Sequence, residues 1–256
     1  MSRPVIIVTG ASRGIGLATV QAALFLGCNV VGAGRTELSS LPSWTSILQK
    51  YPDHAHYVQG DLTSQPIAKE LVAQTIAKYG HIDSVVLNAG ILPPLAKIRD
   101  TDLDEAKRNF DVNFWCVWLF VKESINEVAK RKGRYIIVSS GGAVHAIHAW
   151  GAYCCSKAAL NMLGFMIAAE EPNVTTISLR PGTVDTDMQK LIRDEVHHAM
   201  PKESYQRFVS LKETDTLVKV EDTGYQLAKM ALEASRELNG QFLDYKDEKL
   251  AAFRRQ

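Results

Sequence analysis

The sequence predicts an α/β protein whose doubly wound, parallel sheet of about seven strands carries helices on both faces. Three observations lead to this prediction. Apolar runs of strand length alternate with stretches of helical periodicity along the chain. A glycine-rich turn follows the first of these runs. The chain has 256 residues, 46% of them hydrophobic, which is enough for one large core, and without a repeat or linker we expect a single domain over residues 1–256.

The first unit of this sheet is the most clearly marked. Val5–Val8 is a continuous apolar run, and the turn TGASRGIG follows it over Thr9–Gly16. Apolar periodicity then predicts a helix that ends near Gly27, and Asn29–Ala33 has the character of a second strand. The backbone N–H groups of such a turn, with the partial positive charge of the helix N-terminus, can hold a pyrophosphate. A glycine turn in this position therefore indicates a dinucleotide site.

The remaining elements follow in alternation. Further strands are predicted at 56–59, 84–87, 135–138, 174–179 and 241–245. Helices are expected over 64–79 with Ser64 as the N-cap, over a long stretch from 102 to 132, around Tyr153, and over 220–237. Pro93 and Pro94 mark a loop, and residues 187–216 are more polar, with two helical fragments around Pro201.

Charge and cysteine content narrow the class of protein. The formal net charge is +1, which gives no electrostatic case for nucleic acid or an anionic membrane surface. The four cysteines have neither metal-ligand nor C-x-x-C spacing, so we expect no metal site and a reducing compartment. The longest strongly apolar run, Phe114–Val121, is too short to span a bilayer, and the chain enters a strand at once. We therefore expect a soluble, cytoplasmic protein.

The end of the second strand bears on which dinucleotide binds. An NAD site would place an acidic residue there, about 20 residues past the turn. This chain has Gly34 and Arg35 instead, with no acid before Glu37, and Arg13 in the turn adds a second guanidinium. Two arginines near the adenosine ribose favour a 2′-phosphate and hence NADP(H). The alternative is that both arginines are solvated surface residues.

Tyr153 and Lys157 stand four residues apart in a predicted helix, which places both side chains on one face. A lysine charge about 4–5 Å away favours the phenolate by about 3–4 kcal/mol at an effective dielectric of about 20. We therefore expect the tyrosine pKa to fall toward neutral pH, where general acid–base catalysis is most efficient. Ser140 follows the fifth strand, and its hydroxyl could bind a substrate carbonyl. The alternative is an amphipathic helix with a solvated lysine.

An ordered set of short motifs resembles the short-chain dehydrogenase/reductase family over essentially the whole chain. The motifs are TGASRGIG, Asn88-Ala89-Gly90, Asn113, Ser140, Tyr153-x-x-x-Lys157 and Pro181-Gly182-x-x-x-Thr186. Each is weak alone, but the ordered set is specific. WGAYCCSKAALN, PGTVDTDMQ and NGQFLDY further resemble the fungal group of benzil reductase and sepiapterin reductase-like enzymes. The resemblance implies a Rossmann-type fold and an oxidoreductase that uses NADP(H).

The resemblance also implies a role for each matching residue. Tyr153 would donate the proton in carbonyl reduction, while Lys157 would lower its pKa and hold the nicotinamide ribose. Ser140 would orient the carbonyl, Asn113 would support a water that links Lys157 to solvent, and Arg35 would bind the 2′-phosphate. The other cofactor contacts would come from Gly10, Ser12, Arg13, Gly14, Ile15 and Gly16 in the turn, Asp61 and Leu62 beside the adenine, Asn88, Ala89 and Gly90 along the adenosine ribose, and Pro181, Gly182, Val184 and Thr186 around the nicotinamide.

One departure from the family pattern concerns assembly. Many members end the last strand in an Asp-Gly-Gly turn, whereas residues 243–247 of this chain are LDYKD. The common tetramer packing around that C-terminus is therefore in doubt. A homodimer through the long helices, including the one with Asn113, is favoured. Trp115 and Trp118 of that helix are themselves expected in the core, because large aromatic residues are mostly buried.

Substrate recognition is expected where the family varies. Candidate pocket walls are residues 92–95, Val144, His145, His148, Trp150 and residues 188–208, which suit a small apolar or aromatic carbonyl substrate. We expect residues 187–216 to form a lid. The sequence thus predicts an NADPH-dependent carbonyl reductase for a ketone or 1,2-diketone, benzil-like or sepiapterin-like. Two alternatives stay open: an NADP-dependent secondary-alcohol dehydrogenase, and a catalytically idle NADP(H)-binding sensor.

Overall fold

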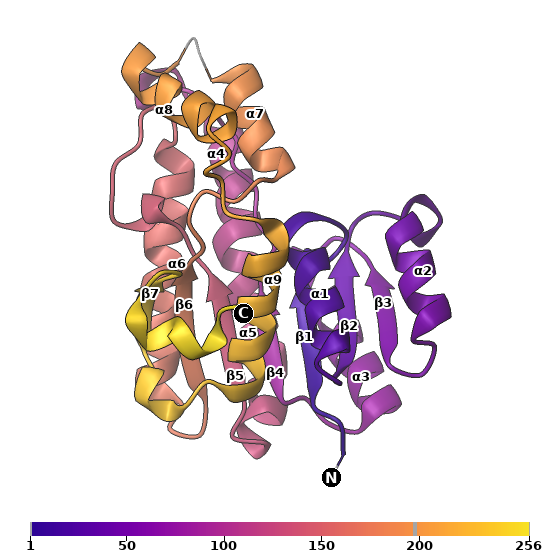
Figure 1. Cartoon of the computed structure of the whole chain (residues 1–256). Coiled ribbons are helices and arrows are strands. Elements are labelled where there is room, and N and C mark those ends of the chain that lie inside the picture. Colours follow the sequence, from indigo (N-terminus) through magenta and orange to yellow (C-terminus); the bar gives the residue numbers. More distant parts are fainter. Residues whose placement is uncertain (1, 197–198, 256) are drawn as a thin grey trace.

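The computed structural model describes residues 2–196 and 199–255 and contains a seven-stranded parallel sheet of order β3-β2-β1-β4-β5-β6-β7 (Figure 1). The strands are β1 Val5–Thr9, β2 Asn29–Gly34, β3 Ala55–Gln59, β4 Ser84–Leu87, β5 Arg134–Val138, β6 Thr175–Arg180 and β7 Gln241–Asp244. The strand order reverses between β1 and β4, the switch point at which ligands bind in such sheets. The predicted doubly wound parallel sheet is confirmed.

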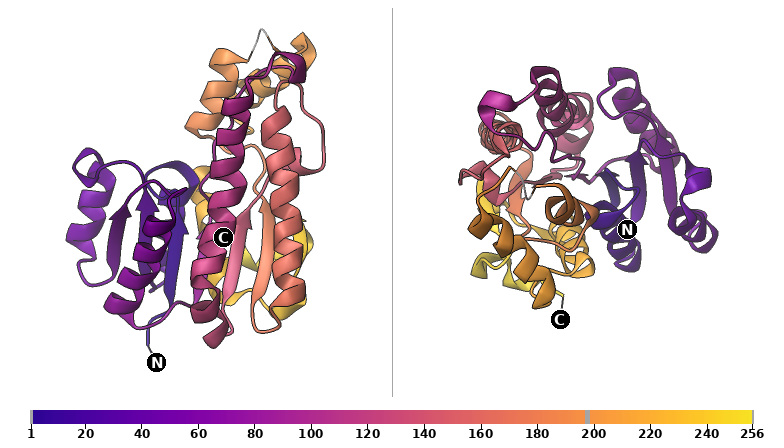
Figure 2. Two further views of the ribbon diagram at one scale, coloured as in Figure 1. Left: turned by 180° about the vertical axis from the view of Figure 1, so that it is seen from behind. Right: turned by 90° about the horizontal axis from the view of Figure 1, so that it is seen from above.

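Helices cover both faces of the sheet. Helices α1 Gly14–Phe25, α2 Pro42–Lys50 and α9 Val220–Glu233 pack on one face, and α3 Gln65–Tyr79, α5 Cys116–Lys130 and α6 Gly151–Glu170 pack on the other (Figure 2). Helix α4 Leu103–Phe110 continues into α5 through one π-helical turn at Asp111–Trp115. Helices α7 Asp187–Glu195 and α8 Lys202–Glu213 lie beyond the carboxyl ends of the strands. Short 3₁₀ turns occupy Leu38–Ser40, Ile98–Asp100, Gly141–Ala143, Arg236–Leu238 and Glu248–Phe253.

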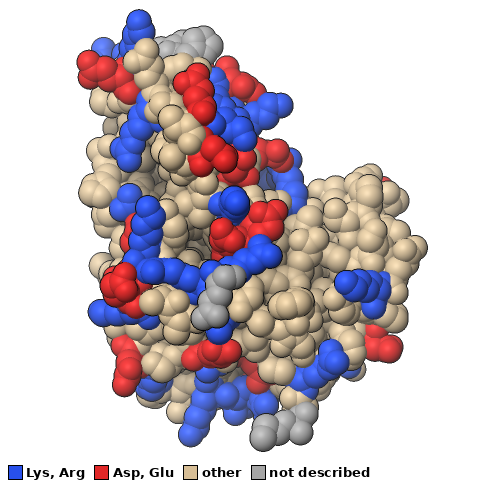
Figure 3. Space-filling model, in the orientation of Figure 1, with Lys and Arg blue, Asp and Glu red and all other residues tan. Residues whose placement is uncertain are grey.

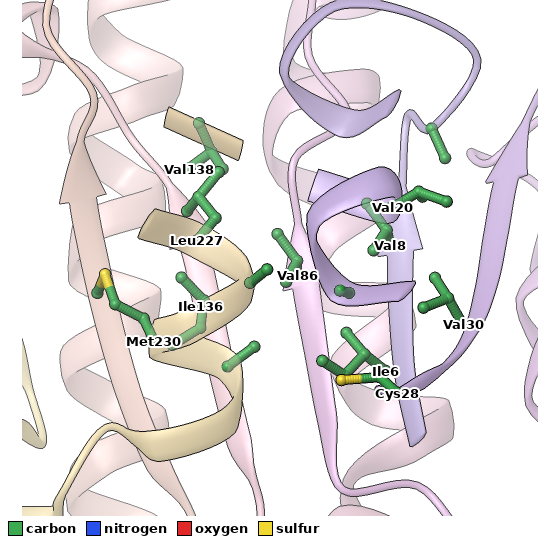
Figure 4. Close-up of a cluster of buried hydrophobic side chains, with 14 of the residues drawn as sticks. Ile6, Val8, Val20, Cys28, Val30, Val86, Ile136, Val138, Leu227 and Met230 are labelled. Atoms are coloured by element: carbon green, nitrogen blue, oxygen red, sulfur yellow. The ribbon is translucent and has the colours of Figure 1, made fainter. Parts of the chain in front are cut away.

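The core explains why the central strands have continuous apolar runs. A parallel strand that is covered on both faces needs apolar residues at successive positions. One face is shown in Figure 4, where Ile6 and Val8 of β1 and Val86 of β4 lie near Val20 of α1. Successive residues of β1, β4 and β5 turn to the other face and pack against α3, α5 and α6; they include Ile7, Val85, Leu87, Tyr135 and Ile137.

Most predicted elements are present with ends shifted by one or two residues, but three details differ. Helix α2 was not predicted, because only Trp44 and Ile47 of that short helix are buried. Ser64 does stand at the N-cap of α3, although its side chain makes no capping hydrogen bond. Helix α9 ends at Glu233 rather than at 237. The range 187–216 forms α7 and α8, and residues 197–198 within it lie outside the described part of the chain.

The expectation that Trp115 and Trp118 lie in the core is wrong. Their exposed fractions are 55% and 46%. The inward face of α5 is already occupied by Cys116, Val117 and Phe120, so helical periodicity turns the two indoles outward. There they form an aromatic cluster with Phe114, with ring centroids 4.8 to 6.0 Å apart.

Helix α6 is long and apolar enough to cross a membrane by length and composition, and is the one such helix within residues 2–196 and 199–255. Its apolar face is used inside the protein, where Leu160, Leu163 and Ile167 join the core beneath the sheet. It also carries the buried Tyr153 and Lys157. Acidic and basic side chains are interspersed over the face shown in Figure 3, in keeping with a net charge of +1.

Candidate active site

The glycine turn between β1 and α1 lies directly against the end of β4. Gly10 has a φ of +65°, and a Cβ atom there would lie 2.8 Å from Ala89 Cα. Thr9 Oγ1 accepts hydrogen bonds from the backbone N–H groups of Asn88 and Ala89 at 3.0 and 3.2 Å. The Asn88 side-chain amide donates to the carbonyls of Thr9 and Gly10. Glycine at position 10 is therefore required, both for the left-handed backbone and for this close approach.

The same turn fits a dinucleotide pyrophosphate. Arg13 is the N-cap of α1, and its side chain, which carries only donors, leaves the N–H groups of the first turn without a side-chain cap. The first N–H groups of a helix have no partner within the helix and attract anions. Gly14, with a φ of +55°, keeps the approach to these N–H groups free of a side chain. The residues present thus form a cradle of the kind that a phosphate group needs.

A cavity of about 750 Å³ runs from this cradle along the carboxyl ends of the strands. It brings together nearly all of the predicted site residues. Those that line it are Gly10, Ser12, Arg13, Gly14, Ile15, Arg35, Asp61, Leu62, Asn88, Ala89, Gly90, Ser140, Tyr153, Lys157, Pro181, Gly182, Val184 and Thr186. Gly16 and Asn113 stand behind the wall. A Cβ atom at Gly16 would lie 2.2 Å from the Gly10 carbonyl oxygen, so Gly16 serves the packing of the turn.

The two predicted phosphate-binding arginines differ in their present partners. Arg13 forms an ion pair with Asp187 at the start of α7, with 3.0 Å between Nη1 and Oδ2. Both side chains are largely exposed, 78% and 67%, so this pair adds little to stability. Arg35 is exposed at the end of β2 and has no ion-pair partner among the described residues. Arg35 is therefore available to an anionic ligand, whereas Arg13 would have to leave Asp187.

Tyr153, Lys157 and Ser140 meet at the other end of the cavity. Tyr153 and Lys157 are one turn apart on α6, and both are buried. The Lys157 Nζ atom donates to the Val138 carbonyl at 2.9 Å and lies 5.7 Å from the centre of the Tyr153 ring. Ser140 follows β5, accepts a hydrogen bond from Gly142 N–H at 3.0 Å, and interacts with the Tyr153 hydroxyl. Two hydroxyls and a buried ammonium thus share one small volume.

The expected lowering of the Tyr153 pKa is wrong for this structure. Burial raises the pKa of the phenol, and the hydrogen bond with Ser140 only partly opposes that rise. Burial also lowers the pKa of Lys157 from 10.5 to about 8. The ammonium and the phenolate attract each other, but both groups have lost their surrounding water, and this loss disfavours each charge. Tyr153 is therefore a protonated phenol at neutral pH.

Asn113 does not line the cavity. Its side chain belongs to a buried hydrogen-bond network that the sequence did not reveal. Its Oδ1 accepts from Ile91 N–H at 2.8 Å, and its Nδ2 donates to Asn109 Oδ1 at 2.9 Å and to Ser156 Oγ at 3.1 Å. Asn109 in turn donates to the backbone carbonyls of 91, 92 and 93. These contacts occupy the Asn113 side chain, so any support for a water would have to come from its backbone. In the sequence, the i,i+4 spacing of Asn109 and Asn113 is the feature from which this network could have been predicted.

The walls beyond Tyr153 are only partly those expected. His145, Trp150, Met188 and Phe208 do line the cavity. The Trp150 ring stacks 5.4 Å from that of Phe208 and stands edge-on to Tyr153 at 5.7 Å. Val144 and His148 are exposed outside the cavity lining, and Leu92 is packed in the core. Ile192, within the expected range 188–208, also lines the cavity, and lining residues that sequence reasoning missed include Gly141, Ile147 and Arg180.

The fold and this cavity together define a class of enzyme. A phosphate cradle at the switch point of a parallel sheet leads directly to a buried tyrosine–lysine–serine cluster, an arrangement suited to an oxidoreductase with a nicotinamide dinucleotide. The family model described as short chain dehydrogenase matches residues 4–197. The chain belongs to this family, whose members use NAD or NADP, and it is an oxidoreductase.

Relatives match over nearly their full length. An uncharacterized oxidoreductase of Schizosaccharomyces pombe is 42% identical over 243 residues, which cover 94% of this chain and 96% of that protein. The benzil reductase ((S)-benzoin forming) IRC24 of Saccharomyces cerevisiae is 36% identical over 259 residues, covering 96% of this chain and 97% of the relative.

Solved structures agree with the fold. The Saccharomyces cerevisiae short chain dehydrogenase/reductase YIR035C superposes with a TM-score of 0.94 at 37% identity, over 98% of this chain and all of that one. A cytoplasmic protein with unknown function from the same yeast gives 0.82 at 37% identity, over 98% of this chain and all of the other. A metagenomic blue fluorescent protein in complex with NADPH gives 0.81 at 25% identity, over 98% of each chain.

Proposed function

We propose that this oxidoreductase is an NADPH-dependent carbonyl reductase that acts on a ketone or 1,2-diketone of benzil-like or sepiapterin-like character. The observation that carries the proposal is the placement of the Ser140 and Tyr153 hydroxyls beside the aromatic wall of Trp150 and Phe208. A hydroxyl pair can hold a carbonyl oxygen, and an apolar wall suits aromatic substituents. The relative named benzil reductase supports the same substrate class.

The residues of the cluster have complementary tasks in this reaction. When bound, the nicotinamide would supply the hydride. Ser140 would donate a hydrogen bond to the carbonyl oxygen, and Tyr153, kept protonated by burial, would give its proton to the developing alkoxide. Lys157, with a pKa of about 8, is mostly charged at neutral pH and would stabilise the phenolate that remains. A raised tyrosine pKa thus suits the reductive direction, in which the tyrosine must begin with its proton.

The preference for NADPH rests on the end of β2. Arg35 lines the cavity, and the segment between β2 and Glu37 supplies no carboxylate to bind a ribose 2′-hydroxyl. A guanidinium without an ion-pair partner among the described residues is suited to a 2′-phosphate. Arg13 could add a second contact by exchanging Asp187 for the phosphate. The NADPH-bound structural neighbour supports the same reading.

We also propose that the protein is a homodimer in the cytoplasm. An exposed apolar surface on the π-helical turn, α5 and α6 comprises Trp115, Trp118, Met162, Phe165 and Met166. Exposed apolar side chains on neighbouring helices commonly mark an interface. The yeast neighbour described as a cytoplasmic protein supports the location. Light scattering after size exclusion should give twice the chain mass, and Trp118→Glu should give the monomer; a monomeric wild type would contradict the dimer.

The test of the function is NADPH oxidation by the purified protein with benzil, an aliphatic 1,2-diketone, an aromatic aldehyde and sepiapterin, with NADH as the cofactor comparison. Turnover with NADPH should exceed that with NADH and should disappear in Tyr153→Phe. Tyr225→Phe, on α9 and outside the cavity lining, is the matched control and should keep its activity. Tight NADPH binding without turnover of any carbonyl would contradict the reductase and favour a binding function. Turnover confined to NADP and secondary alcohols would favour the dehydrogenase.

A further inference from the structure

Arg180 is a charged residue in the cavity to which the proposed mechanism gives no task. It is the last residue of β6. Ser178, two residues earlier, faces α6, because a Cβ atom at Gly164 would lie 2.9 Å from its Oγ. Side chains two residues apart in a strand share a face, so Arg180 also points to the side of α6. It lines the cavity, and its side chain is 35% exposed.

The guanidinium of Arg180 lies against the residue that follows Ser140. A Cβ atom at Gly141 would stand 2.8 Å from Arg180 Nε and 3.0 Å from Nη2, so only glycine leaves room for it. Ser140 itself interacts with the Tyr153 hydroxyl. The guanidinium therefore lines the same cavity as Ser140 and Tyr153 and lies against the residue next to Ser140 in the chain.

Most of the donors of Arg180 have no partner among the described residues. A guanidinium carries five N–H donors. Within the described chain its one ion pair is with Asp244, the residue opposite it on β7, at 3.4 Å from Nε to Oδ2. Asp244 offsets the positive charge, so the pair as a whole is close to neutral. Such a pair offers N–H donors to a neutral oxygen, whereas a carboxylate would also face the charge of Asp244.

We propose that Arg180 binds the second oxygen of a 1,2-diketone while Ser140 and Tyr153 hold the first, and that it thereby selects diketones over simple ketones. The inference rests on the proposed carbonyl reductase function and names the residue that decides its substrate class. In a 1,2-diketone the second carbonyl is one bond from the reacting one, so its oxygen needs a donor beside the Ser140–Tyr153 pair. A monoketone leaves Arg180 without this contact. A hydrogen bond to a charged group changes the rate by about 10- to 100-fold.

The experiment compares 1-phenyl-1,2-propanedione with propiophenone, which lacks the second carbonyl, in NADPH oxidation by wild type and Arg180→Met. The variant keeps an unbranched side chain as far as the position of Nε but has no donor. Its kcat/KM for the diketone should fall about 10- to 100-fold, with kcat/KM for propiophenone changed less than about threefold. Equal losses for both substrates, or a wild type without preference for the diketone, would overturn the proposal.

Two further variants separate substrate binding from a structural role. Asp244→Asn removes the same ion pair between β6 and β7 but keeps the guanidinium, so it should keep the diketone preference; loss of the preference here would overturn the proposal. Gly141→Ala should displace the guanidinium and reduce diketone turnover selectively.

A binding measurement distinguishes failure of this inference from failure of the proposed function. In Tyr153→Phe with NADPH present, the Kd for 1-phenyl-1,2-propanedione should rise about 10- to 100-fold when Arg180→Met is added. This readout does not depend on turnover. An unchanged Kd would overturn the role of Arg180, even if the reductase activity itself is confirmed.

Discussion

The buried ammonium of Lys157 should make stability depend on pH in a way that the variant Lys157→Met isolates. Burial lowers its pKa from 10.5 to about 8. The folded protein therefore binds fewer protons than the unfolded chain between these two values, and stability rises with pH across that window. Below pH 8 the charged lysine destabilises the fold by about 3 kcal/mol, since each pKa unit corresponds to about 1.4 kcal/mol. About 2 kcal/mol of this should be relieved between pH 7 and roughly pH 9.5.

The assay is urea unfolding of wild type and Lys157→Met without cofactor, followed by tryptophan fluorescence at both pH values. Relative to the variant, the free energy of unfolding of wild type should rise by about 2 kcal/mol at the higher pH, because only wild type loses a buried positive charge when Lys157 is deprotonated. Lys69→Met, exposed on α3, is the matched control and should follow wild type. Parallel pH dependences of wild type and Lys157→Met would refute the reasoning, since they would mean that water still reaches the ammonium.

Three further predictions concern the network, the cofactor and the turn. Asn109→Leu should lower the free energy of unfolding by about 1–3 kcal/mol, because buried carbonyls lose their donor; an unchanged urea midpoint would contradict the network. Arg35→Ala should raise the KM for NADPH about 10- to 100-fold and leave that for NADH nearly unchanged, with Arg99→Ala as the exposed control; equal effects on both cofactors would count against the phosphate contact. Gly10→Ala should abolish NADPH binding in calorimetry, whereas Gly27→Ala, with a φ of +85° but open space around it, should only lower Tm; similar binding by both variants would exclude the close contact with β4.

The fold was predictable because parallel strands leave a strong signal. Val5–Val8 is apolar throughout, and Val85–Leu87 follow Ser84 as an apolar run, since both faces of these strands are covered. Helix α2 was not predictable in the same way, because it is short and buries only Trp44 and Ile47. The exposure of Trp115 also escaped prediction, because it depends on which face of α5 meets the sheet.

Residues of the candidate site could be predicted where one short motif contains both the reactive side chains and their characteristic spacing. The glycine turn and the Tyr153–Lys157 pair are of this kind. Asn109 and Arg180 come from separate segments, and their roles depend on what the folded chain places beside them. The direction of the Tyr153 pKa shift likewise depends on depth of burial, which the local sequence does not record.

The close packing of α1 on α9 has a consequence for synthesis of the chain. Gly224 of α9 lies so near α1 that a Cβ atom there would stand 2.5 Å from the Ala18 carbonyl carbon. These partners are about 200 residues apart in the chain. At a synthesis rate of about 5–20 residues per second, α1 lacks its packing partner α9 for roughly 10 to 40 s. The contact between α1 and α9 can therefore form only after nearly the whole chain has been made.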